Sequence, residues 1–230
     1  MTENKTTPLT PMMAQYLEIK SAHKDYLLFY RMGDFYELFF DDAVIASKAL
    51  DIALTKRGKL DNQDVPMCGV PFHAYESYMN RLVAKGYKVA ICEQMEDPKQ
   101  AKGMVRREVI RVVTPGTNIN EQALDEGKNN YIMCIVSLSD QFGVATADVT
   151  TGDFFVTEVD SKRRLLDEIY KFSPTEVVCN EALFMSGLDI DDLKNRVGIV
   201  LYSLENWYFD DSLCENTLKE HFRVNSLEGL

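Results

Sequence analysis

The chain has 230 residues, of which 46% are hydrophobic and 27% are charged, and its formal net charge is −11. This length and composition are typical of one or two folded domains and exclude a disordered or fibrous chain. No apolar run approaches the length of a membrane span, and the first eight residues lack the basic and apolar regions of a signal peptide. We therefore expect a cytoplasmic protein that does not associate with a membrane.

The charge is unevenly distributed along the chain. Residues 1–115 carry 16 Lys and Arg against 15 Asp and Glu, a net charge of +1, whereas residues 116–230 carry 9 against 21, a net charge of −12. This asymmetry predicts two domains, of which only the first could tolerate a phosphate backbone nearby. Its basic residues form two clusters, which are either two patches on one surface or the charged edges of strands and helices. The clusters are Lys56, Arg57 and Lys59, and Lys102, Arg106, Arg107 and Arg111.

The first half alternates helices with strands. Thr10-Pro11 is a helix start, with a capping hydroxyl before a proline at the first helical position. Gly86 is a helix end preceded by a lysine. Between and beyond these signals we expect helices at 11–22, 41–50 and 71–85 and strands at 26–30, 35–39, 53–56, 65–70, 88–92 and 108–113. Helices interleaved with strands predict an α/β sheet.

A polar segment at 116–130 interrupts the pattern and predicts a linker between domains 1–115 and 131–230. Three short strands at 131–138, 143–149 and 153–159 follow, and their turn residues indicate an antiparallel meander. We then expect a helix at 161–172, a strand at 176–179, a weak helical stretch, a strand at 199–202 and a helix at 211–222. This order predicts an RNase H-like α/β fold, which could continue beyond the C-terminal end of the given sequence.

The five cysteines are odd in number, widely spaced and free of any C-x-x-C pair. This pattern predicts neither a disulfide framework nor a zinc site, and we expect no metal. Buried reduced thiols are the expected state of Cys68, Cys92, Cys134, Cys179 and Cys214.

The segment at 31–39, RMGDFYELF, combines a ring and a carboxylate two residues apart. Alternate residues of a strand share a face, so Phe35 and Glu37 are expected to point one way and Tyr36 and Leu38 toward a core. Gly33-Asp34 predicts a chain reversal just before them. The alternative is an ordinary amphipathic strand, in which Phe35 and Phe39 are core residues and Glu37 is solvated.

Five sequence blocks, in order, resemble the start of the bacterial MutS proteins, which recognise mismatched DNA. They are LLFYRMGDFYELF at 27–39, LTKRG at 54–58, PMCGVPFHA at 66–74, VAICEQ at 89–94 and RVVTPGT at 111–117. The resemblance implies an N-terminal mixed-sheet α/β domain that binds mismatches, followed by the family's connector domain.

The resemblance also implies roles for individual residues. Phe35 and Glu37 match the family's F-x-E motif, in which the ring wedges at the defect from the minor groove and the carboxylate hydrogen-bonds the base. A mismatched step costs less to unstack than a matched one, so one contact can discriminate between them. The low dielectric and nearby phosphates should raise the pKa of Glu37. Lys56 and Arg57 match a basic loop that would contact phosphates, and Arg107 and Arg111 are candidate second-line phosphate contacts.

The family's lever, clamp and ATPase domains would lie beyond Leu230, and the chain contains no G-x-x-x-x-G-K-[ST] phosphate loop. We therefore expect this chain to be no enzyme and to bind no cofactor, whereas the full-length protein would use ATP and Mg. The resemblance further implies a homodimer of the full-length protein and binding of the partner MutL through the connector domain.

Two other functions compete with mismatch recognition. An RNase H-like nuclease would need carboxylates converging on two metal ions, but the first strand at 131–138 has none. Asp148 and Asp153 flank a turn and are better explained as hairpin-end residues. A pure protein-interaction scaffold is the second alternative, and the acidic second domain fits it in part.

Overall fold

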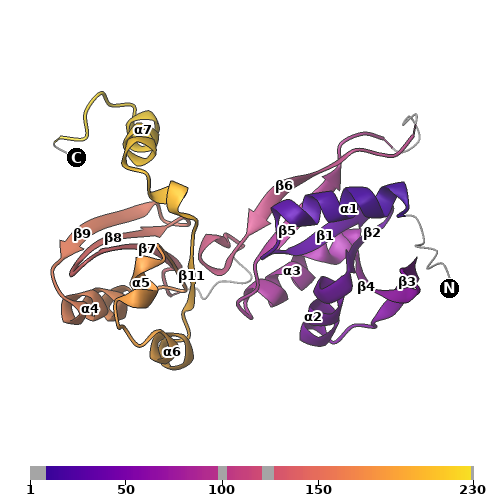
Figure 1. The fold of residues 1–230 in the computed structure, drawn as a ribbon, viewed down its shortest axis with the longest axis horizontal. Coiled ribbons are helices and arrows are strands. Elements are labelled where there is room, and N and C mark those ends of the chain that lie inside the picture. Colours follow the sequence, from indigo (N-terminus) through magenta and orange to yellow (C-terminus); the bar gives the residue numbers. More distant parts are fainter. Residues whose placement is uncertain (1–8, 98–102, 121–126, 229–230) are drawn as a thin grey trace, which may run out of the picture. The chain divides into compact units, whose positions relative to one another are not determined.

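The structure is a computed structural model, and it describes residues 9–97, 103–120 and 127–228 (Figure 1). Lys102 of the second basic cluster lies outside these ranges. The chain divides into two compact units, Met1–Asp125 and Glu126–Leu230. Among the described residues, no helix combines the length and the apolar character required to cross a bilayer.

Unit 1 is built on a six-stranded mixed sheet with the strand order β3-β4-β2-β1-β5-β6. Its central strands β1 and β5 pair in parallel, and the other neighbours are antiparallel. The strands are β1 (Leu27–Met32), β2 (Phe35–Phe39), β3 (Thr55–Leu60), β4 (Gln63–Pro71), β5 (Val89–Gln94) and β6 (Arg107–Val113).

Helices cover both faces of this sheet. α1 (Pro11–Ala22) lies on one face, and α2 (Phe40–Leu50) and α3 (Tyr75–Val83) lie on the other (Figure 1). The Thr10 hydroxyl accepts a hydrogen bond from the Met13 N–H at 3.3 Å, which confirms the predicted cap of α1. A short 3-10 turn, η1 (Phe72–Ala74), precedes α3.

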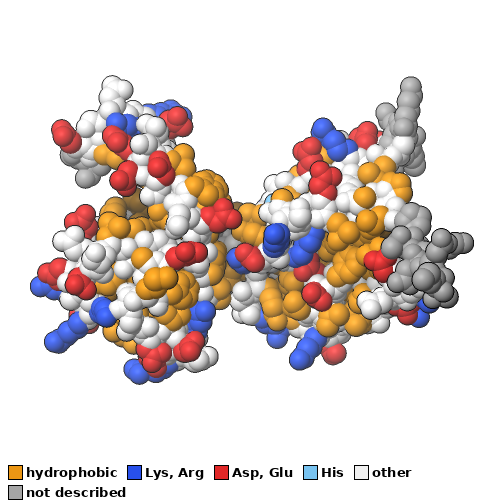
Figure 2. All heavy atoms as spheres, in the orientation of Figure 1, with side chains coloured by type: hydrophobic (Ala, Val, Ile, Leu, Met, Phe, Trp, Pro, Cys, Tyr) orange, Lys and Arg blue, Asp and Glu red, His pale blue; other side chains and the backbone are white. Residues whose placement is uncertain are grey.

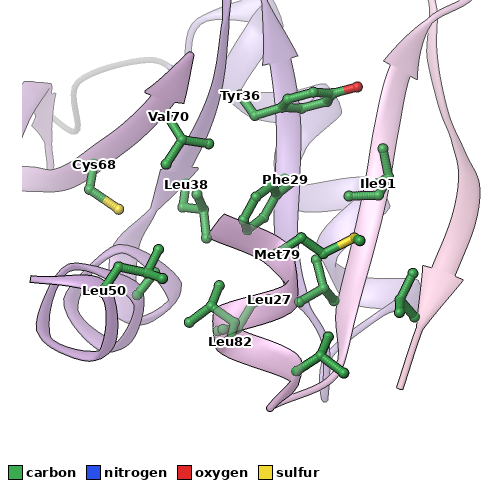
Figure 3. Packing of buried hydrophobic residues seen from close by; sticks show 14 of the residues in the cluster. Leu27, Phe29, Tyr36, Leu38, Leu50, Cys68, Val70, Met79, Leu82 and Ile91 are labelled. Atoms are coloured by element: carbon green, nitrogen blue, oxygen red, sulfur yellow. The ribbon is translucent and has the colours of Figure 1, made fainter. Parts of the chain in front are cut away.

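Alternate residues of the strands separate into two cores. On the α2 and α3 side, side chains from the sheet and from both helices meet in one cluster (Figure 3): Leu27, Phe29, Tyr36, Leu38, Leu50, Cys68, Val70, Met79, Leu82 and Ile91. On the other side, α1 packs over Leu28, Tyr30, Phe39, Ala90 and Cys92. Because both faces are covered, residues 27–30 of β1 are a continuous buried apolar run and not an alternating one.

The hairpin β3–β4 is longer than the two short pieces expected from the sequence. β3 continues to Leu60 and β4 begins at Gln63. The two strands are joined by Asp61 and Asn62, which both have positive φ (48° and 64°). This backbone is that of a two-residue type I′ turn, in which Asn and Asp are favoured.

Unit 2 confirms the predicted order of strands. Its sheet has the order β11-β10-β7-β8-β9, with an antiparallel meander β7–β8–β9 and with β10 and β11 parallel to β7, as in an RNase H-like fold. The strands are β7 (Tyr131–Leu138), β8 (Gln141–Asp148), β9 (Asp153–Val159), β10 (Glu176–Cys179) and β11 (Val200–Ser203). The helices are α4 (Lys162–Phe172), α5 (Ala182–Met185), α6 (Ile190–Asp192) and α7 (Asp211–Phe222), together with a π-helical turn η3 (Leu193–Val197) and a 3-10 turn η4 (Asn206–Phe209).

Both ends of the segment predicted as a linker, 116–130, pack onto the units. At its start, the 3-10 turn η2 (Pro115–Thr117) is closed by reciprocal hydrogen bonds between Thr114 and Thr117, and Gly116 is buried. At its end, Asn130 is buried and its N–H donates to Asp148 at 2.9 Å. Unit 1 therefore continues beyond residue 115.

All five cysteines are free thiols, as predicted. Cys68, Cys92 and Cys179 are buried, whereas Cys134 and Cys214 are partly exposed. Within the described ranges, no three His, Cys, Asp or Glu side chains cluster in a way that could hold a metal ion.

Candidate nucleic-acid interface

Phe35 and Glu37 share the α1 side of strand β2, as the period of two predicts. The Phe35 ring is 48% exposed, whereas Tyr36 and Leu38 are buried on the opposite side under α2 and α3. Phe39 lies on the same side as Phe35 but is buried under α1. One end of β2 is thus anchored in the core while the other presents an aromatic ring to solvent.

The turn that leads into Phe35 is held on both sides. Met32 pairs with Phe35, so Gly33 and Asp34 form a two-residue connection, and Gly33 has φ +57° at its first central position, as in a type II′ turn. The Arg31 Nε–H donates to the Gly33 carbonyl at 2.6 Å. The Phe72 N–H donates to the Asp34 carbonyl at 2.8 Å. Both turn carbonyls are therefore fixed by residues outside the turn.

A cluster on the α2 and α3 side supports this turn, and the sequence analysis did not identify it. The Arg31 guanidinium stacks on the Phe72 ring, 3.3 Å from its centroid, and lies 3.7 Å from a Glu93 carboxylate oxygen. The Tyr36 hydroxyl donates to the same Glu93 oxygen at 2.7 Å. Burial and this hydrogen bond raise the pKa of Tyr36, so the hydroxyl stays protonated and acts as a donor. The only sign of this cluster in the sequence was the position of Arg31 in the RMGDFYELF segment.

Glu37 is not a solvated neighbour of Phe35, because it is paired with Arg57 of β3. Arg57 Nη1 lies 2.5 Å from Glu37 Oε2, and the two side chains are 41% and 14% exposed. Burial raises the pKa of the Glu37 carboxyl above its usual range, and the positive charges of Arg57 and Arg107 oppose this shift.

Strand β4 lies between β2 and β3, and its residue opposite Glu37 is Gly69, whereas Arg57 lies beside the Lys56–Pro66 pair. Gly69 pairs directly with Glu37, and β4 separates β2 from β3 in the sheet. The two paired side chains therefore start from strands about 10 Å apart. A Cβ on Gly69 would lie 3.7 Å from Glu37 Cγ and 3.9 Å from the Phe35 ring.

The other basic residues of the first cluster lie beside Arg57 on β3. Lys56 is exposed and pairs with Asp64 of β4 at 2.8 Å. Arg57 follows it at a register shift between Lys56 and Lys59. Lys56 and Arg57 are thus at an edge strand, where both side chains are accessible.

Arg107 of β6 is an internal residue. It is buried and donates to the Arg31 carbonyl at 2.8 Å, to Gln15 Oε1 at 3.2 Å and to the Val105 carbonyl at 3.0 Å. Its guanidinium also lies 4.9 Å from the centre of the Tyr30 ring. The guanidinium links β6 to β1 and α1, and its burial disfavours the phosphate contact predicted from the sequence.

Arg111 lies on the other side of the sheet from Arg107. It pairs with Ile91, whose side chain is in the core under α2 and α3. Burial raises the pKa of Tyr75 in α3, and the nearby Arg111 charge opposes the shift. β6 and β3 are the two edges of the sheet, about 24 Å apart. Of the two alternatives for the basic clusters, this separation favours charged strand edges over two patches on one surface. On the face seen in Figure 2, basic and acidic side chains are interspersed.

In unit 2, Asp148, a carboxylate considered for the nuclease alternative, accepts hydrogen bonds from nearby backbone N–H groups. Asp148 Oδ1 accepts from the Thr150 N–H at 2.8 Å and its hydroxyl at 2.6 Å, while Oδ2 accepts from the Asn130 N–H. Burial acts to raise the pKa of Asp148, but the hydrogen bonds outweigh it and hold the pKa below its usual range. This geometry is that of a turn residue and supports the hairpin-end interpretation.

Comparison with known proteins gives consistent matches over both units. The family model of MutS domain I matches residues 10–122, and that of MutS domain II matches residues 130–230. The DNA mismatch repair protein MutS of Lachnoclostridium phytofermentans is 58% identical over 96% of this chain, which covers 24% of that relative. MutS of Acetivibrio thermocellus is 48% identical over 96% of this chain, which covers 26% of its length. The chain thus spans about a quarter of these curated relatives, and it belongs to the MutS family of DNA mismatch repair proteins, of which it carries domains I and II.

Proposed function

We propose that unit 1 recognises mismatched or unpaired bases in duplex DNA by inserting Phe35 at the defect from the minor groove. The observation that carries this proposal is the half-exposed Phe35 ring on a strand whose next residue and turn are fixed by the core. Inserting an apolar wedge costs a few kcal/mol per base step in matched DNA and less where pairing is already defective. A rigid wedge therefore binds more tightly to the more easily deformed, mismatched DNA than to matched DNA.

Glu37 supplies the second contact, a hydrogen bond to the wedged base. It lies on the same side of β2 as Phe35, and it is a carboxylate in a place that approaches polyanionic DNA. Phosphates repel an ionised carboxylate, so a base contact is the functional reason for its presence there. Burial already raises its pKa, and approaching phosphates raise it further, which favours a protonated carboxyl that can donate.

Lys56 and Arg57 contact the phosphate backbone from the edge strand β3, where both are accessible. Such contacts position the protein and carry no sequence information. Arg111 remains a peripheral candidate for a phosphate contact, on the other edge of the sheet.

The remaining functions belong to the longer protein. The matched relatives are about four times the length of this chain. We propose that the full-length protein is a cytoplasmic homodimer that uses ATP and Mg in domains outside residues 1–230. We further propose that unit 2 is the connector that binds MutL. The test replaces unit 2 of the full-length protein by an unrelated domain. Loss of MutL binding, with mismatch binding retained, would support this division of roles.

The test of recognition is the ratio of affinities for a duplex with one G·T mismatch and for the matched duplex, measured with the full-length protein. Phe35→Ala should reduce this ratio at least tenfold. Ile110→Ala is the control, because Ile110 is a 57% exposed apolar side chain on the distant edge strand β6. An unchanged ratio in Phe35→Ala would refute the wedge.

A further inference from the structure

In the protein without DNA, Glu37 on the wedge side of β2 forms an ion pair with Arg57 of β3. Arg57 Nη1 and Glu37 Oε2 are 2.5 Å apart, and Glu37 is largely shielded from water. A carboxylate held by a guanidinium stays ionised, and an ionised carboxylate cannot donate a hydrogen bond. The proposed base contact of Glu37 competes with this ion pair.

The fold makes the pair possible through two local features. Arg57 lies in the irregular part of β3, between Lys56 and Lys59. Gly69 leaves β4 without a side chain next to Glu37. Gly69 does not have a positive φ, so the backbone conformation does not require glycine there.

We propose that Arg57 is a specificity-determining residue that competes with the mismatched base for Glu37. On a matched duplex the ion pair persists, since the carboxylate has no base partner and Arg57 cancels its repulsion by the phosphates. At a defect the pair opens and Glu37 turns to the base. This inference rests on the proposed function, and it differs from a role of Arg57 as a phosphate contact alone.

The two roles predict opposite outcomes for discrimination in Arg57→Ala. A simple phosphate contact contributes equally on both duplexes, so its loss would leave the mismatch-to-match ratio unchanged. Loss of a competitor leaves Glu37 uncompensated on matched DNA and free at a mismatch, so the ratio should rise. Partly exposed ion pairs contribute little, and we expect a rise of about two- to fivefold.

The binding experiment compares the full-length protein with Arg57→Ala, Lys56→Ala, Glu37→Ala and the double variant, on G·T and matched duplexes. Lys56 is the matched control, because it is the neighbouring cation on β3 and pairs with Asp64 instead of Glu37. Lys56→Ala should weaken binding to both duplexes and leave the ratio unchanged. In the Glu37→Ala background, Arg57→Ala should no longer alter the ratio.

A second measurement needs no DNA. The carboxyl carbon of Glu37 is titrated by NMR in the 230-residue chain. Arg57 opposes the upward shift of the Glu37 pKa, together with Arg107. Arg57→Ala should therefore raise the Glu37 pKa, whereas Lys56→Ala should leave it unchanged.

The outcomes separate this inference from the proposed function. A ratio in Arg57→Ala equal to or below the parent's, while Phe35→Ala still abolishes discrimination, overturns the competition and leaves the wedge standing. An unchanged Glu37 pKa in Arg57→Ala also overturns it. A parent protein that does not discriminate at all overturns both.

Discussion

Arg107 shows that a cation in a basic segment can belong to the interior of a domain. Its guanidinium donates to three oxygens, from Arg31, Gln15 and Val105, on three different parts of unit 1. Guanidinium is the most weakly hydrated of the cationic groups, and its planar set of donors suits several fixed acceptors at once. The residue therefore stabilises the side of the sheet on which α1 packs.

We expect Arg107→Met to lower the free energy of unfolding of unit 1 by about 2–3 kcal/mol, because buried acceptors lose their donor. Urea denaturation measures the loss. Arg106→Met is the control, because Arg106 is exposed and its ion pair with Glu108, at 3.5 Å, is also exposed to solvent. Equal effects of the two substitutions would contradict an internal role for Arg107.

The orientation of a side chain was predictable where the two-residue repeat of a strand determines it. The facing of Phe35 and Glu37 follows from the alternation of a strand and was correct. The Glu37–Arg57 pair was not predictable, because it joins residues 20 positions apart across an intervening strand and depends on a register shift in β3. The burial of Arg107 was missed for a similar reason, since only tertiary structure gives the guanidinium its three acceptors.

At the scale of elements, the β1–β2 turn determines where the exposed ring stands. Gly33 has φ +57°, a conformation that costs a residue with a Cβ about 1–2 kcal/mol. No atom lies within 4 Å of a Cβ built there, so the cost of a substitution is conformational and not steric.

Gly33→Ala should therefore lower the stability of unit 1 by about 1–2 kcal/mol and reduce the mismatch-to-match ratio, because the turn carbonyls would shift. Thermal denaturation and duplex binding measure the two effects. Gly143→Ala is the control, as Gly143 has equally open surroundings without a positive φ. If both variants behave alike, the strain assigned to Gly33 is wrong.

The turn between β8 and β9 depends on the carboxylate of Asp148. Asp148 accepts hydrogen bonds from Thr150 and Asn130, and its pKa in the folded state is below the usual range. A carboxyl with a depressed folded pKa stabilises the protein above its unfolded pKa of about 3.9, and this contribution is lost as the pH falls through the folded pKa.

Asp148→Asn should thus destabilise unit 2 by about 1–3 kcal/mol at pH 7, since an amide group replaces one of the two acceptor oxygens. The difference from the parent should shrink below about pH 4, as the parent's carboxyl protonates. Denaturation at several pH values gives this profile. Asp160→Asn, at an exposed pair with Arg164, should show little change. A difference that persists unchanged at acidic pH would contradict the assignment.

Elements with local signals were predicted best. The bounds of β2, β10 and α7 agree with the expectation, since each combines a clear periodicity with flanking turn or cap residues. β3 was predicted too short because residues 55–60 are polar and exposed, so their strand structure comes from pairing with β4 and from the turn at Asp61 and Asn62. Tertiary pairing overrides weak local propensity in such a strand.

At the scale of the whole molecule, charge and core both separate the two units. Residues 116–230 carry a net charge of −12, which opposes a close approach of unit 2 to phosphates. Each unit has its own hydrophobic core. The division between DNA and protein partners that we propose follows this separation.

The 230-residue chain itself should not hydrolyse ATP, because its sequence contains no phosphate-binding loop. Phosphate release in the presence of Mg and ATP measures this, and the full-length protein, for which we propose ATP hydrolysis, is measured alongside. Turnover that copurifies with the 230-residue chain through successive columns would contradict the prediction.

The fixed turn before Phe35 also has a kinetic consequence. The backbone of the wedge is ordered before DNA arrives, because hydrogen bonds from Arg31 and Phe72 hold both carbonyls of the turn. Little ordering of the protein remains to be done on binding, and the first encounter depends on phosphates that matched and mismatched duplexes share. Association rates should therefore be similar for the two duplexes, and the distinction between them should reside in how slowly the protein leaves a defect.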